Sequence, residues 1–533
     1  MVALKHRAGS LFQLLFPFYS LISGGSYSSK ALVSDLLAGL TMSVFHIPQG
    51  LAYGLLAGLR PINGLYTSLI PVALYSLLGR SRHLSLGTFS LTSLLLADMI
   101  GTTYRQYMDQ LPGSNSTIKV DEINLNADCS SDSDEYYGGL TVEEYARLQV
   151  AVLGSFAASV INMALGTLQL GFVMKYVSNP MLRGFTTAAA VHIFTSQVPM
   201  LLGVQPTGGD NFVKLIASYT GIINDIASTN WTNRNHLRCV HEYLNPRVKK
   251  CIKVPLPVEL LIILSALVAS HALQLQSRFG VDVVGTVPRG LPLPLVPDFS
   301  FMPNVLLPCL PVSLVGAAMS LSIGKMYALQ FDYEVNYNGE LFVLGTSSLF
   351  GSFFQCFYAT GALARCAVVV GAGMKSQVAS AVSCLVLLLV VLAVGPLFEA
   401  VPDCALASVI VVSLVGLFKQ VTDIPKLWRE AKYLDLSTWL LTAVSVLVLD
   451  VSLGLAVGFC YSLACILVTR CMATRREGQP GDGDTRDARR RGSKISVSFN
   501  NKYGSSSATV DVSGVDSATK YPMMIGPTGR TSK

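Results

Sequence analysis

One arginine inside a long apolar region constrains the fold of this chain more than any other residue. The stretch Tyr358–Lys375 reads YATGALARCAVVVGAGMK, with Arg365 at its centre. Long apolar runs at Leu341–Phe354 and Val378–Phe398 flank it, which places the arginine at membrane depth. An unpaired cation there costs about 2.5–3.5 kcal/mol on insertion scales, so a negative group is expected beside it. The small residues before Arg365 favour a broken helix whose N-terminus faces a cavity and attracts anions.

The composition is typical of a protein that crosses the bilayer many times. Of its 533 residues, 51% are hydrophobic and 13% are charged, whereas a soluble protein carries about a quarter charged residues. The net charge of +7 comes largely from an arginine-rich tail, which fits a cytoplasmic flank better than nucleic-acid binding. The eleven cysteines form no CxxC pair, and no metal-ligand or Ser/His/Asp cluster is evident. We therefore predict no enzyme activity, catalytic residue, metal, cofactor or nucleic-acid partner, and a lipid bilayer as the surroundings.

Two residues inside the first predicted span and two short apolar segments suggest where a binding site lies. The first predicted span, Asp35–Leu59, contains Pro48, which frees a backbone carbonyl, and Gln49, whose amide finds no partner in lipid. Two segments, Ser85–Ile100 and Ala362–Gly373, are too short to cross the membrane untilted and are predicted to be half-helices. They occupy comparable places in the two halves of the chain. Paired interrupted segments indicate a transporter built from inverted repeats, with its site at the midplane.

The remaining apolar stretches predict the other spans and the orientation. The acidic loop 102–147 contains the sequon at Asn115, so we expect it to be extracellular and glycosylated. The segment 1–34 and the tail 471–533 are expected in the cytoplasm, and the Gly/Ser/Arg-rich tail is predicted to be disordered. The other spans are predicted at Gly64–Leu78, Leu148–Leu170, Met181–Gly203, Val254–Leu275, Leu306–Leu329, Cys404–Phe418, Ser437–Leu449 and Val451–Val468, with Phe212–Ala227 marginal.

Several long motifs, occurring in order, resemble the sulfate permease family of anion transporters, the solute carrier 26 group. The resemblance runs from about Asp35 to Arg470 and implies that 35–470 is one transmembrane transporter domain. The motifs that carry it are DLLAGLTMSVFHIPQGLAYGLLAG (35–58), GLYTSLIPVALYSLLGRSRHLSLGTFS (64–90), PMLRGFTTAAAVHIFTSQ (180–197), VVGTVPRGLPLPLVPD (283–298) and GKMYALQFDYEVNYNGEL (324–341).

This resemblance implies an all-α, polytopic membrane protein with a seven-plus-seven inverted-repeat fold. In the family, a mobile core carries small inorganic anions past a scaffold by an elevator-like movement. Family members are homodimers, so the resemblance implies a homodimer for this chain as well. Transfer of the family's anion site onto this chain implies six residues: Gln49, Tyr53, Phe89, Leu363, Ala364 and Arg365.

Three features depart from the family pattern. The serines usual around the arginine are replaced in the run ALARC, which removes hydroxyl donors at Ala362, Ala364 and Cys366. Polar residues at Asn230–Lys253 stand where the family has an apolar span, so one span of the first repeat is predicted to be missing. The family's C-terminal STAS domain (sulfate transporter and anti-sigma-antagonist) is predicted to be absent, because the tail lacks the apolar periodicity to form it.

The leading functional hypothesis is secondary active anion transport, with exchange of chloride and bicarbonate, or of sulfate and oxalate. The alternatives are an uncoupled anion channel and a degenerate member that transports nothing, which the ALARC run and the missing span favour. The plasma membrane is the expected location, and an incomplete scaffold would favour retention in the endoplasmic reticulum. If Arg365 is structural, the sequence offers a carboxylate such as Glu340 as its partner.

Overall fold

The computed structural model describes residues 27–109, 140–171, 177–202, 258–449 apart from 286 and 289, 451–477, 494–501 and 504–511. The chain divides into two compact units, Met1–Ile466 and Leu467–Lys533. Several predictions fall outside the described residues. These are the N-terminal segment up to residue 26, most of loop 102–147 with Asn115, both the marginal and the missing span within 203–257, and most of the tail.

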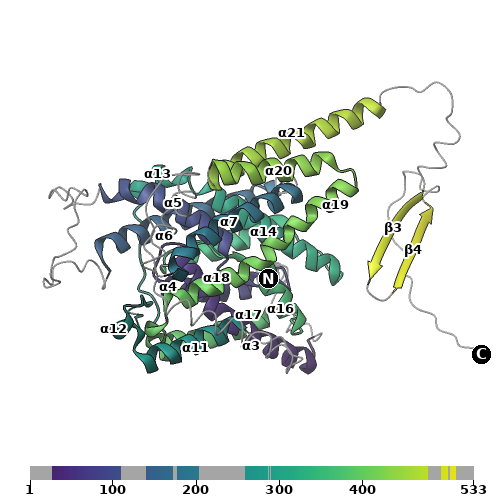
Figure 1. The fold of residues 1–533 in the computed structure, drawn as a ribbon. Coiled ribbons are helices and arrows are strands. Elements are labelled where there is room, and N and C mark those ends of the chain that lie inside the picture. Colours follow the sequence, from purple (N-terminus) through teal and green to yellow (C-terminus); the bar gives the residue numbers. More distant parts are fainter. Residues whose placement is uncertain are drawn as a thin grey trace, which may run out of the picture. The chain divides into compact units, whose positions relative to one another are not determined.

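In its described residues, the first unit contains helices and one pair of two-residue strands (Figure 1). Its elements are α3 (Ser29–Leu56), α4 (Pro61–Leu78), β1 (Leu86–Gly87), α5 (Ser90–Met108), α6 (Val142–Thr167), α7 (Asn179–Leu202), α11 (Val258–Leu273), α12 (Leu275–Phe279), η4 (Phe299–Phe301), α13 (Met302–Leu306), α14 (Leu310–Gln330), α15 (Tyr337–Ser352), β2 (Thr360–Gly361), α16 (Leu363–Gly371), α17 (Val378–Leu389), η5 (Val390–Val394), η6 (Gly395–Ala400), α18 (Asp403–Phe418), η7 (Lys419–Thr422), α19 (Asp423–Arg429) and α20 (Tyr433–Val448). Helix α21 (Val451–Glu477) begins in the first unit and ends in the second.

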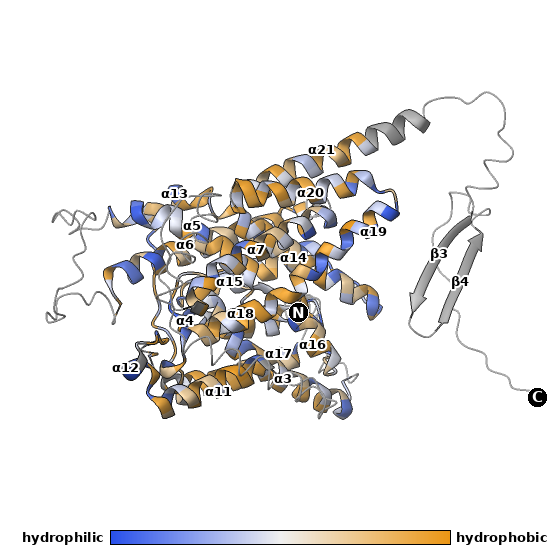
Figure 2. Cartoon of the chain, viewed as in Figure 1, coloured by the Kyte–Doolittle hydropathy of each residue, from blue (hydrophilic) through white to orange (hydrophobic). Residues whose placement is uncertain are grey.

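The prediction of an all-α, polytopic membrane protein is confirmed. Among the described residues, six helical segments are long and apolar enough to cross a bilayer, and three shorter apolar helices accompany them. Hydrophobic residues run along α11, α18 and α20. Hydrophilic residues gather at α19, at the C-terminal end of α5 and at the N-terminal end of α6 (Figure 2). The inverted-repeat relation between the two halves stays a prediction.

Small residues bring the helices that surround the site into close contact. α3 packs against α4 and α17, α15 packs against α6, and α7 packs against α18 and α20. At the crossing of α3 and α4, a Cβ added to Gly64 would lie 1.8 Å from the carbonyl oxygen of Gly50. Such backbone approach is the means by which membrane helices gain van der Waals contact without a hydrophobic driving force.

A buried carboxylate ties α3 to the turn between α16 and α17. Asp35 accepts hydrogen bonds from the backbone N–H groups of Lys375 (2.6 Å) and Ser376 (3.2 Å), from the Ser376 hydroxyl (2.6 Å) and from the Tyr27 hydroxyl (2.5 Å). Charge-assisted bonds of this kind are stronger than neutral ones. Asp35 therefore fixes the C-terminal end of α16 relative to α3. Both helices carry predicted site residues.

The structure differs from the predicted boundaries at both interrupted segments and in the tail. The first half-helix begins at Ser90 rather than at Ser85, because the residues before it form β1 and an extended lead-in. The second unit contains an antiparallel hairpin of β3 (Lys494–Asn501) and β4 (Gly504–Asp511), where the tail was expected to be disordered. The alternation of apolar and polar residues in KISVSFN is the period-two signal of a strand, which a reading by composition overlooks.

Candidate anion-binding site

A strand pair brings together the starts of two helices from distant parts of the sequence. β1 leads into α5 and β2 leads into α16, and the two strands pair in an antiparallel ladder. No side chain caps the first turn of either helix, at Phe89 or at Ala362. Each helix start therefore keeps backbone N–H groups without an intrahelical acceptor, together with a partial positive charge of about half an elementary charge.

Arg365 lies in the first turn of α16 and is 1% exposed. Its Nε donates to Ser85 Oγ (2.9 Å), Nη1 donates to Thr88 O (2.9 Å) and Gln49 Oε1 (3.2 Å), and Nη2 donates to Ser85 O (3.2 Å) and Thr360 O (3.4 Å). These five bonds match the five N–H groups of a guanidinium, and every acceptor is a neutral oxygen. The side chain thus joins both strands to α3, while its positive charge is not cancelled by any of these partners.

Glu340 is not the partner of this arginine. Its carboxylate is buried at the start of α15 and accepts a hydrogen bond from the hydroxyl of Tyr75 on α4. α15 packs on α4 and α6, away from the strand pair, so the proximity of Glu340 to Arg365 in sequence does not become a contact.

Gln49 connects Arg365 to a carboxylate that the sequence analysis did not assign to the site. The amide oxygen of Gln49 accepts from Arg365, and its nitrogen donates to Glu259 Oε2 at 3.1 Å. Since a guanidinium only donates and a carboxylate only accepts, these two neighbours fix the orientation of the amide. Glu259 lies in the first turn of α11. The available signal was a single carboxylate at the start of an otherwise apolar span.

The other predicted site residues lie on the same elements with different exposure. Tyr53 is one helical turn after Gln49 on α3 and is 3% exposed, and Phe89 precedes α5 and is 8% exposed. Leu363 is 43% exposed, and Ala364 beside it on the first turn of α16 is also exposed. The structure therefore brings Gln49 and Arg365 into contact. It also places the carbonyl of Thr88, the residue before Phe89, against the arginine, and it leaves Leu363 and Ala364 exposed at the first turn of α16.

Cys366 occupies a position where the family has a serine, but its side chain turns away from the open face. The thiol is buried, accepts from the backbone N–H of Ser85 (3.2 Å) and approaches the Ser85 carbonyl oxygen (3.8 Å). The expectation that Cys366 deletes an anion donor is therefore not supported by the position of this side chain. Of the three positions that lack the family's serine, Ala364 alone is exposed, because Ala362 and Cys366 are buried.

Gly87 is required where β1 passes the guanidinium. Its φ of +150° is a conformation that residues with side chains rarely adopt. An added Cβ would lie 3.1 Å from Nη2 of Arg365 and 3.2 Å from Nε2 of His46. We expect Gly87→Ala to destabilise the protein by about 1–3 kcal/mol, through backbone strain and displacement of the arginine.

The control for this variant is Gly101→Ala on α5, where an added Cβ meets nothing within 4 Å. That change should raise stability by about 0.5–1 kcal/mol, because alanine favours the helix. The comparison is made by heating the purified proteins in detergent and measuring the fraction that stays monodisperse on size-exclusion chromatography. Equal midpoints for the two variants would show that the space around Gly87 is not restricted.

An arrangement of apolar helices with two interrupted helices that meet end to end is the architecture of secondary membrane transporters. The chain belongs to the sulfate permease family, whose profile matches residues 32–442. This family consists of permeases, which move solutes without transforming them, so membership confirms that the chain is not an enzyme.

Relatives and solved structures agree with the family. The chain is 35% identical to prestin from Danio rerio over 449 residues and 35% identical to human solute carrier family 26 member 6 over 443 residues, matches that cover 83% and 82% of this chain. It spans only 58% and 55% of those two proteins. The murine solute carrier 26 family member A9 anion transporter, solved in the inward-facing state, superposes with a TM-score of 0.75 at 29% identity, covering 85% of this chain and 71% of that one. The transmembrane domain of the cyanobacterial bicarbonate transporter BicA has the same fold, with a TM-score of 0.62 at 17% identity, covering 82% of this chain and 98% of that one.

Proposed function

We propose that the chain is a secondary active transporter of small inorganic anions, which exchanges chloride for bicarbonate or sulfate for oxalate. The observation that carries this proposal is the β1–β2 pair, which sets two uncapped helix starts beside one buried arginine. The two helix starts together rival the charge of the guanidinium. A site with this potential, in a helical membrane protein, selects for negative solutes.

The residues have distinct parts in this proposal. The N–H groups at the start of α16, beside the exposed Leu363 and Ala364, donate to the anion, and Tyr53 and Phe89 line the site with ring edges of partial positive charge. Because all five donors of Arg365 are already used, the arginine acts through its potential and by holding the two strands. The site then moves with α3, α5 and α16 past the rest of the protein in an elevator-like movement of a homodimer in the plasma membrane.

A second candidate, a family member that transports nothing, is favoured by one observation. Arg365 has no N–H group left to donate to an anion, and Ala364 offers no hydroxyl in its place. A hydrogen bond to a charged group contributes about 1.5–3 kcal/mol, so the missing hydroxyl weakens anion binding about ten- to a hundredfold if nothing replaces it. The third candidate, an uncoupled channel on the same fold, differs from an exchanger only in its kinetics.

Uptake of radiolabelled chloride, sulfate and oxalate separates these functions. Cells that express the chain are first tested for surface delivery by biotinylation, with purified protein in liposomes as the substitute if the chain stays in the endoplasmic reticulum. We expect saturable uptake that rises when an exchangeable anion is loaded on the opposite side. A current that scales linearly with voltage, without such stimulation, would indicate a channel. Background uptake of all three anions in liposomes would contradict the transporter proposal.

A further inference from the structure

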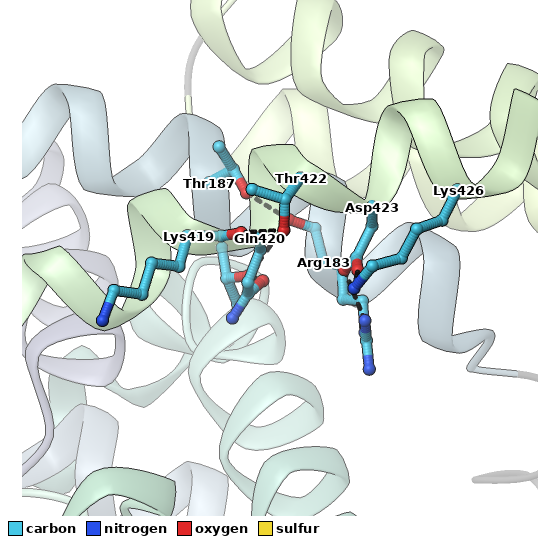
Figure 3. A network of polar contacts seen from close by, with 8 residues as sticks. Arg183, Thr187, Lys419, Gln420, Thr422, Asp423 and Lys426 are labelled. Carbon is cyan, nitrogen blue, oxygen red and sulfur yellow. Dashed lines mark hydrogen bonds and ion pairs between the residues drawn. The ribbon is translucent and has the colours of Figure 1, made fainter.

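One surface of the first unit combines basic side chains with exposed aromatic rings. It is formed by the start of α7, by η7 and α19, and by the start of α20, and it is called the α7–α19 surface below. Figure 3 shows the part of it that α7, η7 and α19 contribute. Its basic side chains are all exposed, and its two aromatic rings are among the most exposed large side chains of the described chain. These residues are Arg183, Lys419, Lys426, Arg429, Lys432, Trp428 and Tyr433.

Asp423 holds two of these cations side by side. It accepts from Nη1 of Arg183 and, at 3.4 Å, from Nζ of Lys426, and its side chain is only 13% exposed. The side chains of Arg183 and Lys426 remain 54% and 66% exposed. One carboxylate thus lies behind two cations whose remaining N–H groups face outward. The pair keeps a net positive charge and free donors.

Hydrogen bonds within and between α7 and η7 hold the backbone that carries these side chains. The hydroxyl of Thr187 donates to the carbonyl oxygen of Arg183 (2.8 Å), and that of Thr422 donates to the carbonyl oxygen of Lys419 (2.8 Å). Thr186 on α7 donates to the side chain of Gln420 on η7 (2.5 Å). α7 and η7 are therefore joined independently of the ion pair, and the two cations project from a pre-formed junction (Figure 3).

The aromatic side chains lie at the end of an apolar span. α18 is apolar along its length and leads through η7 into α19 (Figure 2). Trp428 is 65% exposed and Tyr433 is 60% exposed, and their rings meet edge to face at 6.0 Å. Exposed Trp and Tyr rings in this position mark the headgroup level of a membrane. α19 lies at the same end of the helical body as the start of α3, opposite the C-terminal end of α5 and the N-terminal end of α6 (Figure 1).

We propose that the α7–α19 surface binds the headgroup phosphate of an anionic phospholipid, with Arg183 and Lys426 as its donors and with Trp428 and Tyr433 in the interfacial layer. The other acidic groups on this surface are Glu430, which pairs with Lys432 at 2.7 Å, and Asp435. With Asp423 they give three carboxylates against five cations, so the surface carries a net positive charge. Neither the family match nor the transport proposal assigns a ligand here, and this inference does not depend on transport.

A phospholipid fits these observations better than a soluble anion or a protein partner does. A cationic pair alone would accept any phosphate, but the exposed ring of Trp428 on the same short helix α19 is favoured in the partly apolar interfacial layer of a membrane. An anionic lipid satisfies both requirements at one depth. Attraction to an anionic leaflet contributes a roughly fivefold enrichment per Lys or Arg and weakens with salt.

The fluorescence of Trp428 reports on the lipid beside it. The full chain is purified and reconstituted in nanodiscs of phosphatidylcholine that contain a fixed fraction of brominated phosphatidylglycerol or, in a parallel set, brominated phosphatidylcholine. The chain has three tryptophans, so the signal of Trp428 is the difference between the unchanged chain and Trp428→Phe. The test variant is the double change Arg183→Gln with Lys426→Gln. The matched control is Arg278→Gln on α12, which is exposed and lies elsewhere on the first unit.

We expect brominated phosphatidylglycerol to quench Trp428 several times more strongly than brominated phosphatidylcholine, and the preference to fall roughly fivefold or more in the double variant. The control should keep the preference, and high salt should reduce it in the unchanged chain. The conservative variant Arg183→Lys with Lys426→Arg should retain most of it, which separates loss of charge from loss of structure. Equal quenching by both lipids, or a preference that survives in the double variant, would overturn the proposal. Absence of quenching by either lipid would show that Trp428 is not in the interface and would overturn it as well.

Discussion

Replacement of Arg365 by alanine is expected to reduce anion uptake to background and to lower the thermal stability of the purified protein. Within the described part of the chain, the guanidinium supplies the full positive charge at the paired helix starts, so its removal is expected to take away the attraction for the anion. It also leaves buried carbonyl oxygens at Ser85, Thr88 and Thr360 without their donor, and each such group costs about 1–3 kcal/mol. We expect transport and stability to fall together, because the five hydrogen bonds of Arg365 both hold the two strands and position its positive charge.

A series at position 365 distinguishes the two effects. Arg365→Lys keeps the charge but offers three donors to five acceptors, so partial transport and intermediate stability are expected. Arg278→Ala, on the exposed α12, is the control for loss of an arginine elsewhere. All variants are compared at matched surface expression and by thermal unfolding in detergent. Full transport by Arg365→Ala would show that the charge is dispensable and that the anion binds elsewhere.

The sequence alone identified the parts of this site that depend on local composition. Small residues before an arginine inside an apolar region predicted a helix that starts at Ala362, and α16 starts one residue later, at Leu363. Two interrupted segments predicted that α5 and α16 belong together, and the strands that lead into them are paired. Gln49 was identified because an amide in a span needs a partner, and its partner is the arginine. These inferences held because burial of polar groups in a membrane permits few arrangements.

What the sequence could not supply depends on how distant elements pack. Glu340 was a reasonable partner for Arg365 by distance along the chain, but α15 turns it towards Tyr75. Glu259 is far from Gln49 in sequence, and only the packing of α11 on α3 makes the contact. Likewise, the orientation of Cys366 towards Ser85 follows from the strand pair rather than from residue type. Side-chain direction at a broken helix is therefore a tertiary property.

The contact between Gln49 and Glu259 leads to the second large expected effect, a gain of anion affinity in Glu259→Gln. The carboxylate is two hydrogen bonds away from the guanidinium, through one amide, so it opposes the positive potential of the site. At a separation of roughly 8 Å and an effective dielectric constant of about 20, this opposition is about 2 kcal/mol. Glutamine keeps the acceptor for the Gln49 amide and removes only the charge. We therefore expect the half-saturating chloride concentration to fall about ten- to thirtyfold.

This expectation is checked by chloride uptake at graded concentrations and by the chloride dependence of thermal unfolding, with Glu334→Gln as the control at an exposed carboxylate. Protonation of Glu259 removes the same charge, so the unchanged chain should bind chloride more tightly as the pH falls, whereas Glu259→Gln should respond little. An unchanged or weaker affinity in Glu259→Gln would contradict the electrostatic argument. It would mean that the carboxylate serves to hold Gln49, and hence the arginine, in place. The two readings differ because only the electrostatic one requires the affinity to rise when the geometry is preserved.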